Sequence, residues 1–371
     1  MDDSRAVEGF TILAIETSCD ETAAAIIRDG RVIIANVVSS QMALHERYGG
    51  VVPEMASRQH ILHIAPVIEE AVAALPGGFE EIHAVATTYG PGLAGALLSG
   101  INAAKAVAWA RGLPLIGVNH LEGHIYSNWL IPEKPEERRA REARGEPPPV
   151  HEPPQFPLIC LIVSGGHTSL VLLRGHGDYQ LLGQTRDDAV GEAFDKTARL
   201  LGLGYPGGPA IERIADGGQR GRLQLPRAWL KDSYDFSFSG VKTAVLHQVE
   251  ARKSHIGSGK EERARPLVEL DPQFTAQLAA AFQESVVDVL ATKTAEAARA
   301  FGAREVLLAG GVAANQALRK RLSQVVEVPV RYPPLWLCTD NAAMIGAAAY
   351  YRYEAGLKGW DLTAVPNLRL A

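Results

Sequence analysis

Two histidines in the stretch VNHLEGHIYS, His120 and His124, stand four residues apart with Glu122 between them. In a helix, residues i and i+4 lie about 40° apart around the axis, so both imidazoles can bind one metal ion. The alternative is one core or surface histidine and one capping histidine. Asp340, in the stretch LCTDN, is a candidate third ligand, although an aspartate before an Ala-rich helix can equally be its N-cap.

The position of Glu122 bears on the kind of metal chemistry. In the H-E-x-x-H motif of zinc peptidases, the glutamate follows the first histidine directly and acts as the general base. Here Glu122 stands two residues after His120, roughly 200° around a helix, and is expected to point away from the metal. The pattern therefore predicts a metal site without the peptidase base in its usual place.

Two glycine turns follow predicted strands, Ser164-Gly165-Gly166-His167 and Gly310-Gly311. Glycine allows close approach of a phosphate to the backbone, whose N–H groups bind its charge. The alternative is a tight turn without a ligand. The chain has no P-loop motif. The stretch at residues 90–95 matches G-x-G-x-x-G, but no βαβ unit with an acidic residue about 20 positions later follows it, which argues against a dinucleotide fold.

Two carboxylates flank a rigid turn at residues 205–209. Asp195 falls on a predicted helix before this turn, and Glu212 follows it. Carboxylates near a glycine turn can accept hydrogen bonds from ribose hydroxyls. The alternative is a surface aspartate before a turn that ends a helix.

The elements that must position these residues form a pattern that occurs twice. Strand, polar turn, strand, turn, strand is predicted at residues 11–15, 22–27 and 31–38, and again, about 150 residues later, at 158–163, 168–173 and 179–183. Further strands are predicted at residues 82–88, 115–118 and 305–308, and helices at 53–75, 190–203, 241–252, 272–301 and 341–353.

The repeat predicts a duplicated α/β fold of the actin-like, ribonuclease-H-like type, with two lobes and a nucleotide cleft between them. Polar turns of this kind form anion-binding concavities that face the phosphates. We expect an N-terminal lobe at residues 1–130, completed by about 335–371, and a C-terminal lobe at 158–334. Residues 131–157 are Pro-rich, charged and aperiodic, and are predicted to be a linker or mobile insertion, either a solvated loop or one that contacts RNA or a partner.

The composition is that of an ordinary globular enzyme, with 371 residues, 47% hydrophobic, 21% charged and a formal charge of −5. Residues 196–265 nevertheless hold 13 Lys or Arg against 7 Asp or Glu, a plausible footprint for RNA phosphates or simply a solvated mixed face. Three dispersed cysteines, an acidic start without a targeting pattern and no apolar run of ~18 residues predict a cytoplasmic protein without membrane association.

Taken together, nine stretches in order over nearly the whole chain resemble one family. These are IETSCDET, YGGVVPEMASRQH, TYGPGLAGALLSG, VNHLEGHIYS, LIVSGGHTSL, GEAFDKTARLLGLGYPGGP, DFSFSGVKTA, AGGVAANQALR and CTDNAAMIGAA. The set is similar to that of the bacterial tRNA threonylcarbamoyladenosine transferases, the TsaD family, once described as glycoproteases. Residues 131–157 and 254–266 look longer than the core of that family.

The resemblance implies an actin-like fold and transfer of threonylcarbamoyl from threonylcarbamoyl-AMP to N6 of adenosine 37, with release of AMP, in tRNAs that read codons beginning with A. It implies His120, His124 and Asp340 as ligands of iron, Fe²⁺, or sometimes zinc, Zn²⁺. The implied partners are tRNA, a TsaB-like heterodimer partner and a TsaE-like ATPase. The positions that match the family's adenylate site are Ile162, Val163, Ser164, Gly165, Gly166, Asp195, Gly208, Glu212 and Asn315, of which Glu212 varies among members.

A proton must leave N6 during such a transfer, and Asp20 or Glu16, in the first polar turn, can accept it. Both can equally be structural turn residues. Three other functions compete with the transferase: a metallopeptidase, a non-catalytic nucleotide-binding scaffold, and a sugar kinase or other ATPase of the same fold. The paired histidines with Asp340 argue against the scaffold and the kinase, and the displaced Glu122 argues against the peptidase.

Overall fold

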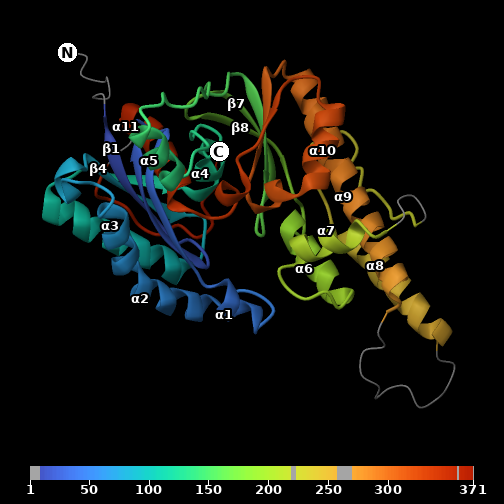
Figure 1. The fold of residues 1–371 in the computed structure, drawn as a ribbon. Coiled ribbons are helices and arrows are strands. Elements are labelled where there is room, and N and C mark those ends of the chain that lie inside the picture. Colours follow the sequence, from blue (N-terminus) through green and yellow to red (C-terminus); the bar gives the residue numbers. More distant parts are fainter. Residues whose placement is uncertain (1–8, 219–222, 257–269, 357–358, 371) are drawn as a thin grey trace. The chain divides into compact units, whose positions relative to one another are not determined.

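The computed structural model describes residues 9–218, 223–256, 270–356 and 359–370, and Figure 1 traces them. By their contacts these residues fall into two units. Unit 1 holds the described residues of Met1–Gln155, Arg174–Tyr179 and Tyr332–Ala371, and unit 2 holds those of Phe156–Leu173 and Gln180–Arg331. No helix within the described ranges is long and apolar enough to cross a bilayer.

Unit 1 is built on a five-stranded sheet in the order β3-β2-β1-β4-β5. Strand β1 pairs antiparallel with β2, and β2 pairs antiparallel with β3, whereas β1–β4 and β4–β5 are parallel. Its elements are β1 (Thr11–Glu16), β2 (Glu21–Arg28), β3 (Val32–Ser40), α1 (Met42–Glu46), α2 (Pro53–Val72), η1 (Gly78–Glu81), β4 (Ala84–Gly90), α3 (Ala94–Arg111), β5 (Leu115–Asn119), α4 (His120–Tyr126), α5 (Pro135–Ala143), η4 (Leu335–Leu337) and α11 (Ala342–Glu354).

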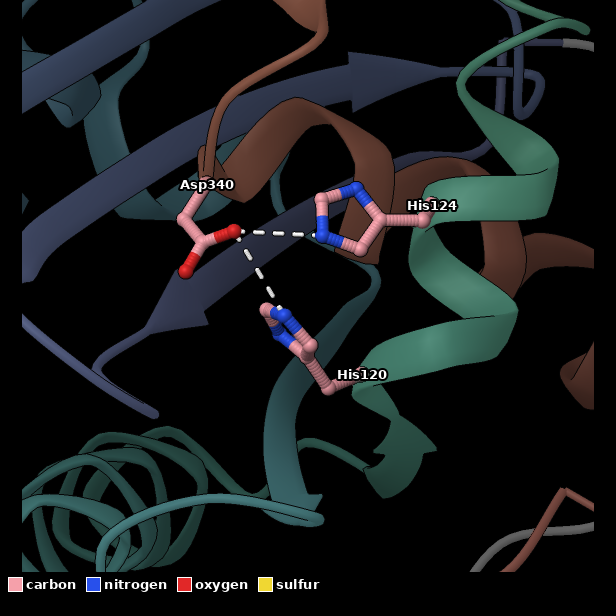
Figure 2. A group of neighbouring side chains, drawn as sticks. All are labelled: His120, His124 and Asp340. Atoms are coloured by element: carbon pink, nitrogen blue, oxygen red, sulfur yellow. Dashed lines mark ion pairs between the residues drawn. The ribbon is translucent and has the colours of Figure 1, made fainter. Parts of the chain in front are cut away.

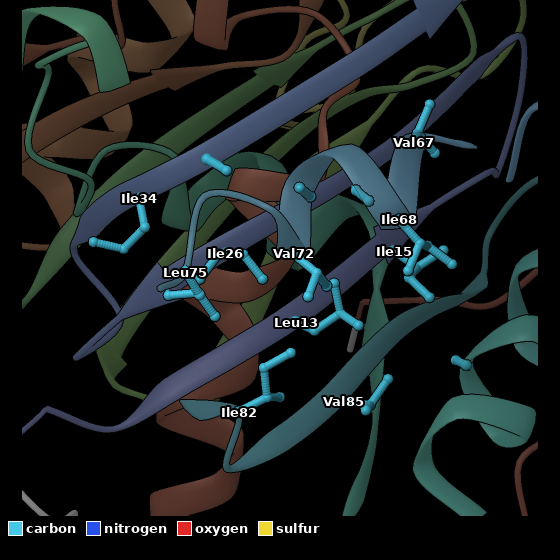
Figure 3. Packing of buried hydrophobic residues seen from close by; sticks show 14 of the residues in the cluster. Leu13, Ile15, Ile26, Ile34, Val67, Ile68, Val72, Leu75, Ile82 and Val85 are labelled. Carbon is cyan, nitrogen blue, oxygen red and sulfur yellow. The ribbon is translucent and has the colours of Figure 1, made fainter. Parts of the chain in front are cut away.

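Both faces of the unit 1 sheet are covered, which explains why β1 is buried throughout and apolar at its four central positions. Alternate side chains of a strand point to opposite faces. Leu13 and Ile15 belong to the core beneath α2 and α3, as Figure 3 shows. The other face packs on α11, where a Cβ on Gly346 would lie 2.5 Å from Ile27 and 3.3 Å from Ala14. Glycine therefore lets α11 approach the sheet closely.

Unit 2 repeats this topology strand for strand. Its sheet has the order β10-β9-β6-β7-β8, so β6, β7, β8, β9 and β10 correspond to β1, β2, β3, β4 and β5. Strand β6 is antiparallel to β7 and parallel to β9, which is parallel to β10. Its elements are β6 (Leu158–Val163), β7 (Thr168–Gly175), β8 (Asp178–Gln184), α6 (Val190–Leu200), α7 (Gly207–Ala215), α8 (Ser239–Ile256), α9 (Pro272–Ala300), β9 (Glu305–Ala309), η3 (Gly311–Ala314), α10 (Gln316–Val325) and β10 (Val330–Arg331). The duplication predicted from the two strand triplets is confirmed.

The predicted strands and the five predicted helices are all present, with ends shifted by a few residues. The segment 131–157 differs from its prediction as an aperiodic linker, because it contains helix α5 and lies in unit 1 up to Gln155. The extra stretch at 254–266 lies outside the described residues from residue 257 onward.

Helix α5 forms because its charged residues satisfy one another locally. Pro135 occupies its first turn, where a missing N–H costs no hydrogen bond. The backbone N–H of Lys134 donates to the Glu137 carboxylate at 3.0 Å. Arg138 pairs with Glu142 one turn later, at 2.7 Å. Only the expectation of an aperiodic segment was wrong, because it did not consider that neighbouring charges can pair along a helix.

Candidate functional site

Helix α4 carries the two histidines and begins directly at the end of β5. Its N-cap is Asn119, whose Oδ1 accepts a hydrogen bond from the N–H of Leu121 at 2.9 Å. His120 and His124 lie on one face and converge on Asp340, as Figure 2 shows. Their Nε2 atoms are 3.5 and 3.1 Å from Asp340 Oδ1. The predicted group of three is thus brought together within unit 1.

Asp340 is not the N-cap of the helix that follows it. That role belongs to Asn341, whose Oδ1 accepts a hydrogen bond from the N–H of Met344 at 3.1 Å. The carboxylate of Asp340 faces the histidines instead. The alternative reading of this aspartate as a cap is therefore wrong by one residue.

The three side chains have the donor set and the spacing of a metal site. One donor atom from each lies within 4.8 Å of the others. Ligands around a tetrahedral ion with bonds near 2.1 Å are separated by about 3.4 Å, close to the two distances above. His124 is buried, and within the described part of the chain its Nδ1 has no hydrogen-bond partner, whereas its Nε2 faces Asp340 Oδ1. Two buried imidazoles that share one carboxylate have the donor set of a divalent metal site, so the group fits such an ion.

The other nitrogen of His120 is held by a buried carboxylate at the end of β1. Its Nδ1 lies 3.2 Å from Glu16 Oε2 and 3.0 Å from Ser18 Oγ. Glu16 also accepts hydrogen bonds from the Ser18 N–H and the Thr88 hydroxyl, both at 2.5 Å. Contacts of this kind orient a ligating histidine and leave its other nitrogen for the metal. The sequence marked Glu16 but missed Ser18 and Thr88, which carry no motif of their own.

The charges in this group shift one another's pKa values. Burial acts to lower the pKa of His120, but the carboxylates of Asp340 and Glu16 together raise it well above its usual value. Burial acts to raise the pKa of Asp340, but His120 and His124 lower it. In the same way the pKa of Glu16 is lowered, mainly by His120 against the effect of burial. The metal-free protein therefore favours a charged cluster with a proton on His120.

The turn between β1 and β2 adds acidic residues beside the cluster. Asp20, a predicted proton acceptor, is half-buried there. The next residue, Glu21, has a pKa raised to about 9 by burial and by the charges of Asp20 and Asp340. Sequence reasoning missed Glu21, although the adjacent pair Asp20-Glu21 was the available signal.

Glu122 takes no part in this cluster. Its buried carboxylate binds Tyr179 and Arg352. As expected from its position in the motif, Glu122 does not face the candidate metal ligands. Its two carboxylate oxygens accept hydrogen bonds from Tyr179 and Arg352 instead.

In unit 2, the two predicted glycine turns follow neighbouring parallel strands, β6 and β9. They meet at Gly310, which has φ +90° and whose Cβ would lie 2.4 Å from the carbonyl oxygen of Val163. Only glycine fits this position. Gly165 and Gly166 are exposed, whereas the side chains of Ile162 and Val163 are fully buried. The strand residues can therefore contribute to a ligand site only through their backbone.

The turn after β6 is tied to α6, and α6 is tied to α7. The N–H of Gly191 donates to the Ser164 carbonyl at 3.1 Å. Asp195 Oδ1 accepts a hydrogen bond from the N–H of Gly207 at 2.7 Å, and burial raises the pKa of this carboxyl. Gly208, the next residue, has open space around its Cα.

Helix α7 is tied in turn to the start of α10. Glu212 Oε1 accepts a hydrogen bond from the N–H of Gln316 at 2.6 Å. Asn315 is the N-cap of α10, accepting from the N–H of Leu318 at 2.9 Å and donating to Gln283 at 2.9 Å. The residues predicted for an adenylate site are therefore linked contact by contact within unit 2. The carboxamide of Asn315 uses one acceptor and one donor position in these structural bonds.

Comparison with known proteins matches most of this chain to one family. The model of the TsaD family, described as tRNA N6-adenosine threonylcarbamoyltransferase, matches residues 32–138 and 140–347. A curated protein of that name from Thermomicrobium roseum is 59% identical, over 94% of this chain and 93% of its own length. One from Dehalococcoides mccartyi is 52% identical, over 96% of this chain and 98% of its own length.

Solved structures support the fold. HypF from T. kodakarensis is similar with a TM-score of 0.56 at 14% identity, covering 96% of this chain and 50% of HypF. A full-length HypF in a phosphate- and nucleotide-bound form gives 0.54 at 14% identity, covering 94% of this chain and 47% of that one. At this identity the likeness concerns the fold alone, which is the actin-like, two-lobed α/β fold predicted from the duplication.

Removing a ligand should remove the metal. We expect His120→Ala and Asp340→Ala to lose at least about tenfold in bound divalent metal relative to the wild type, because two donors remain of three. Elemental analysis of purified protein measures this. His63→Ala, which changes a half-buried histidine of α2, is the matched control and should keep its metal. Metal content unchanged in both ligand variants would disprove the site.

Metal binding should release a proton and tighten as pH rises. Because the pKa of His120 is raised, its charged form stabilises the metal-free protein fully below about pH 6.5, and this contribution is lost as pH rises through the folded-state pKa. An ion binding at Nε2 must displace that proton, so affinity should rise up to about tenfold per pH unit below the raised folded-state pKa of His120 and level off above it. Calorimetry in two buffers of different ionisation enthalpy measures the release. Equal heats in both buffers would contradict it.

Proposed function

The chain belongs to the TsaD family, and we propose on that basis that it transfers threonylcarbamoyl from threonylcarbamoyl-AMP to N6 of adenosine 37 in tRNAs that read codons beginning with A. AMP is the other product. The observation that supports this function most directly is the group His120, His124 and Asp340 in unit 1, in a chain that matches the family model over residues 32–138 and 140–347.

The metal we assign to this group is Fe²⁺, with Zn²⁺ as the alternative. His120 and His124 would provide imidazole nitrogens and Asp340 a carboxylate oxygen, a donor set that suits either ion. When bound, the ion supplies Lewis-acid polarisation of substrate oxygens and a fixed point for their orientation.

The transfer forms one bond and breaks another. The N6 amine attacks the carbamoyl carbon of the mixed anhydride, the bond from that carbon to the phosphate oxygen breaks, and AMP leaves with the electron pair. Backbone N–H groups of the turn at residues 164–166 and of Gly310-Gly311 would hold the phosphate as its negative charge grows.

The ribose of the adenylate would bind the carboxylates of Asp195 and Glu212. In each carboxylate, one oxygen accepts a hydrogen bond from a backbone N–H, that of Gly207 or Gln316 respectively. The second oxygen can accept a hydrogen bond from a ribose hydroxyl. Gly208 leaves open space for the nucleotide. Asn315 would act by shaping the loop before α10.

A proton leaves N6 in this reaction, and we assign Asp20 as its acceptor. It is half-buried in the turn that follows β1, beside the metal group. Glu16 is fully buried and already accepts several hydrogen bonds, so its contacts favour orientation of His120 over proton transfer. The two carboxylates predicted as alternatives for one role would then have different roles.

Isosteric variants of these two carboxylates should have opposite signatures. Asp20→Asn should lower the single-turnover rate by about 10²- to 10⁴-fold with unchanged metal content, because only the proton acceptor is lost. Glu16→Gln should weaken metal binding by about 10- to 100-fold, because the partner of His120 is altered. Rates and bound metal are measured on the same preparations. Loss of metal in Asp20→Asn, with none in Glu16→Gln, would reverse the assignment.

The proposed partners are tRNA, a TsaB-like heterodimer partner and a TsaE-like ATPase, acting in the cytoplasm without a membrane. The basic stretch at residues 196–265 is the proposed contact for tRNA phosphates, although part of it lies outside the described residues.

Reconstitution tests the activity. The purified chain is incubated with unmodified tRNA and threonylcarbamoyl-AMP, with and without the two partner proteins, and nucleosides are analysed by mass spectrometry after digestion. Threonylcarbamoyladenosine should form only when the chain is present, and His120→Ala should abolish it. No modified adenosine under any combination would overturn the proposal.

A further inference from the structure

Glu122 is a buried carboxylate between the two metal-binding histidines that the transfer chemistry leaves unused. Only 3% of its surface is exposed. Its Oε1 accepts a hydrogen bond from the Tyr179 hydroxyl at 2.7 Å, and its Oε2 accepts one from Arg352 at 2.9 Å. A buried carboxylate requires such partners, because burial without them is costly.

These partners connect the two helices that present the metal ligands. Helix α4 carries His120 and His124. Helix α11 begins two residues after Asp340 and carries Arg352 near its other end. The ion pair between Glu122 and Arg352 therefore joins α4 to the end of α11 that lies opposite to Asp340.

Close packing supports the same arrangement. A Cβ on Gly123 would lie 2.7 Å from Cδ1 of Ile345 and 3.3 Å from Cγ of Met344, so α4 and α11 touch beside the site. The close packing at Gly123 sets the separation of α4 and α11. The ion pair between Glu122 and Arg352 restricts rotation and sliding of one helix against the other.

The segment Arg174–Tyr179, which comprises the end of β7, the turn after it and the start of β8, belongs to unit 1 and contacts both helices. Tyr179 provides the hydroxyl to Glu122 of α4. His176 stacks on Tyr351 of α11, with ring centroids 4.0 Å apart and 11° between the planes. Its Nδ1 lies 2.8 Å from the hydroxyl of Tyr126 of α4. The segment thus adds contacts to each helix of the pair.

We propose that Glu122 is a positioning residue of the metal site: with Arg352 and Tyr179 it fixes α4 against α11 so that His120, His124 and Asp340 converge on one ion. This inference rests on the proposed metal site. It also explains why a glutamate between the two histidines is useful in a protein that does not need a peptidase base. Removing one partner leaves the other buried and uncompensated, whereas removing both relieves that cost.

Cobalt binding tests this role without tRNA or threonylcarbamoyl-AMP. Metal-free protein is titrated with Co²⁺, and the affinity and the visible absorption spectrum are recorded with the melting temperature of the metal-free form. Glu122→Gln and Arg352→Met should each weaken Co²⁺ binding by about 10- to 100-fold and change the spectrum. Tyr179→Phe, which keeps the ring, should cause a smaller loss in the same direction and covers the case in which the other variants fail to fold.

The double variant Glu122→Gln/Arg352→Met separates positioning from stability. Its melting temperature should recover relative to either single variant, while its Co²⁺ affinity stays low. Glu142→Gln, which breaks the more exposed Arg138–Glu142 pair of unit 1, is the matched control and should bind Co²⁺ as the wild type does.

Two results would overturn the inference: lower melting temperatures in the single variants with unchanged Co²⁺ affinity and spectrum, or no Co²⁺ binding by the wild type. Failure of the transfer reaction while the wild type still binds Co²⁺ would count against the proposed function alone.

Discussion

The convergence of buried charges at the meeting of α4 and α11 is the constraint on which the rest of unit 1 depends. Two imidazoles and two carboxylates, of Asp340 and Glu16, lie within contact distance in a largely buried place. Each alone would be costly to bury, and together they compensate one another or bind an ion. The sheet, the close packing of α11 on it at Gly346, and the N-caps Asn119 and Asn341 all help to hold these side chains in place.

The duplicated topology gives both candidate sites the same place in their units. In unit 1, Glu16 ends β1, Thr88 lies two residues before the end of β4, and His120 directly follows β5. In unit 2, Ser164 and Gly310 follow the corresponding strands β6 and β9. Polar groups gather at this edge of an open α/β sheet. One unit presents side chains suited to a metal there, and the other presents backbone amides and glycines suited to a phosphate.

The glutamate of HLEGH illustrates how spacing changes the role of a residue. At the second position of the motif it would face the metal and act as a base. At the third position it faces Tyr179 and Arg352, and it connects helices instead. The same residue type, moved by one position, belongs to the support of the site and not to its chemistry.

Local patterns in the sequence were sufficient for the elements, the duplication and the shared face of His120 and His124, because strand alternation, helical spacing and glycine turns depend on near neighbours. They missed the helix at Pro135–Ala143, within the expected insertion, where charges pair along the helix. Only the tertiary structure decided that Asn341 caps α11 and frees Asp340, that Glu16 holds His120, and that Glu122 reaches Arg352. The physical reason is distance along the chain: Asp340 meets histidines that precede it by more than two hundred residues, and packing of α4 and α11 around one sheet brings them together.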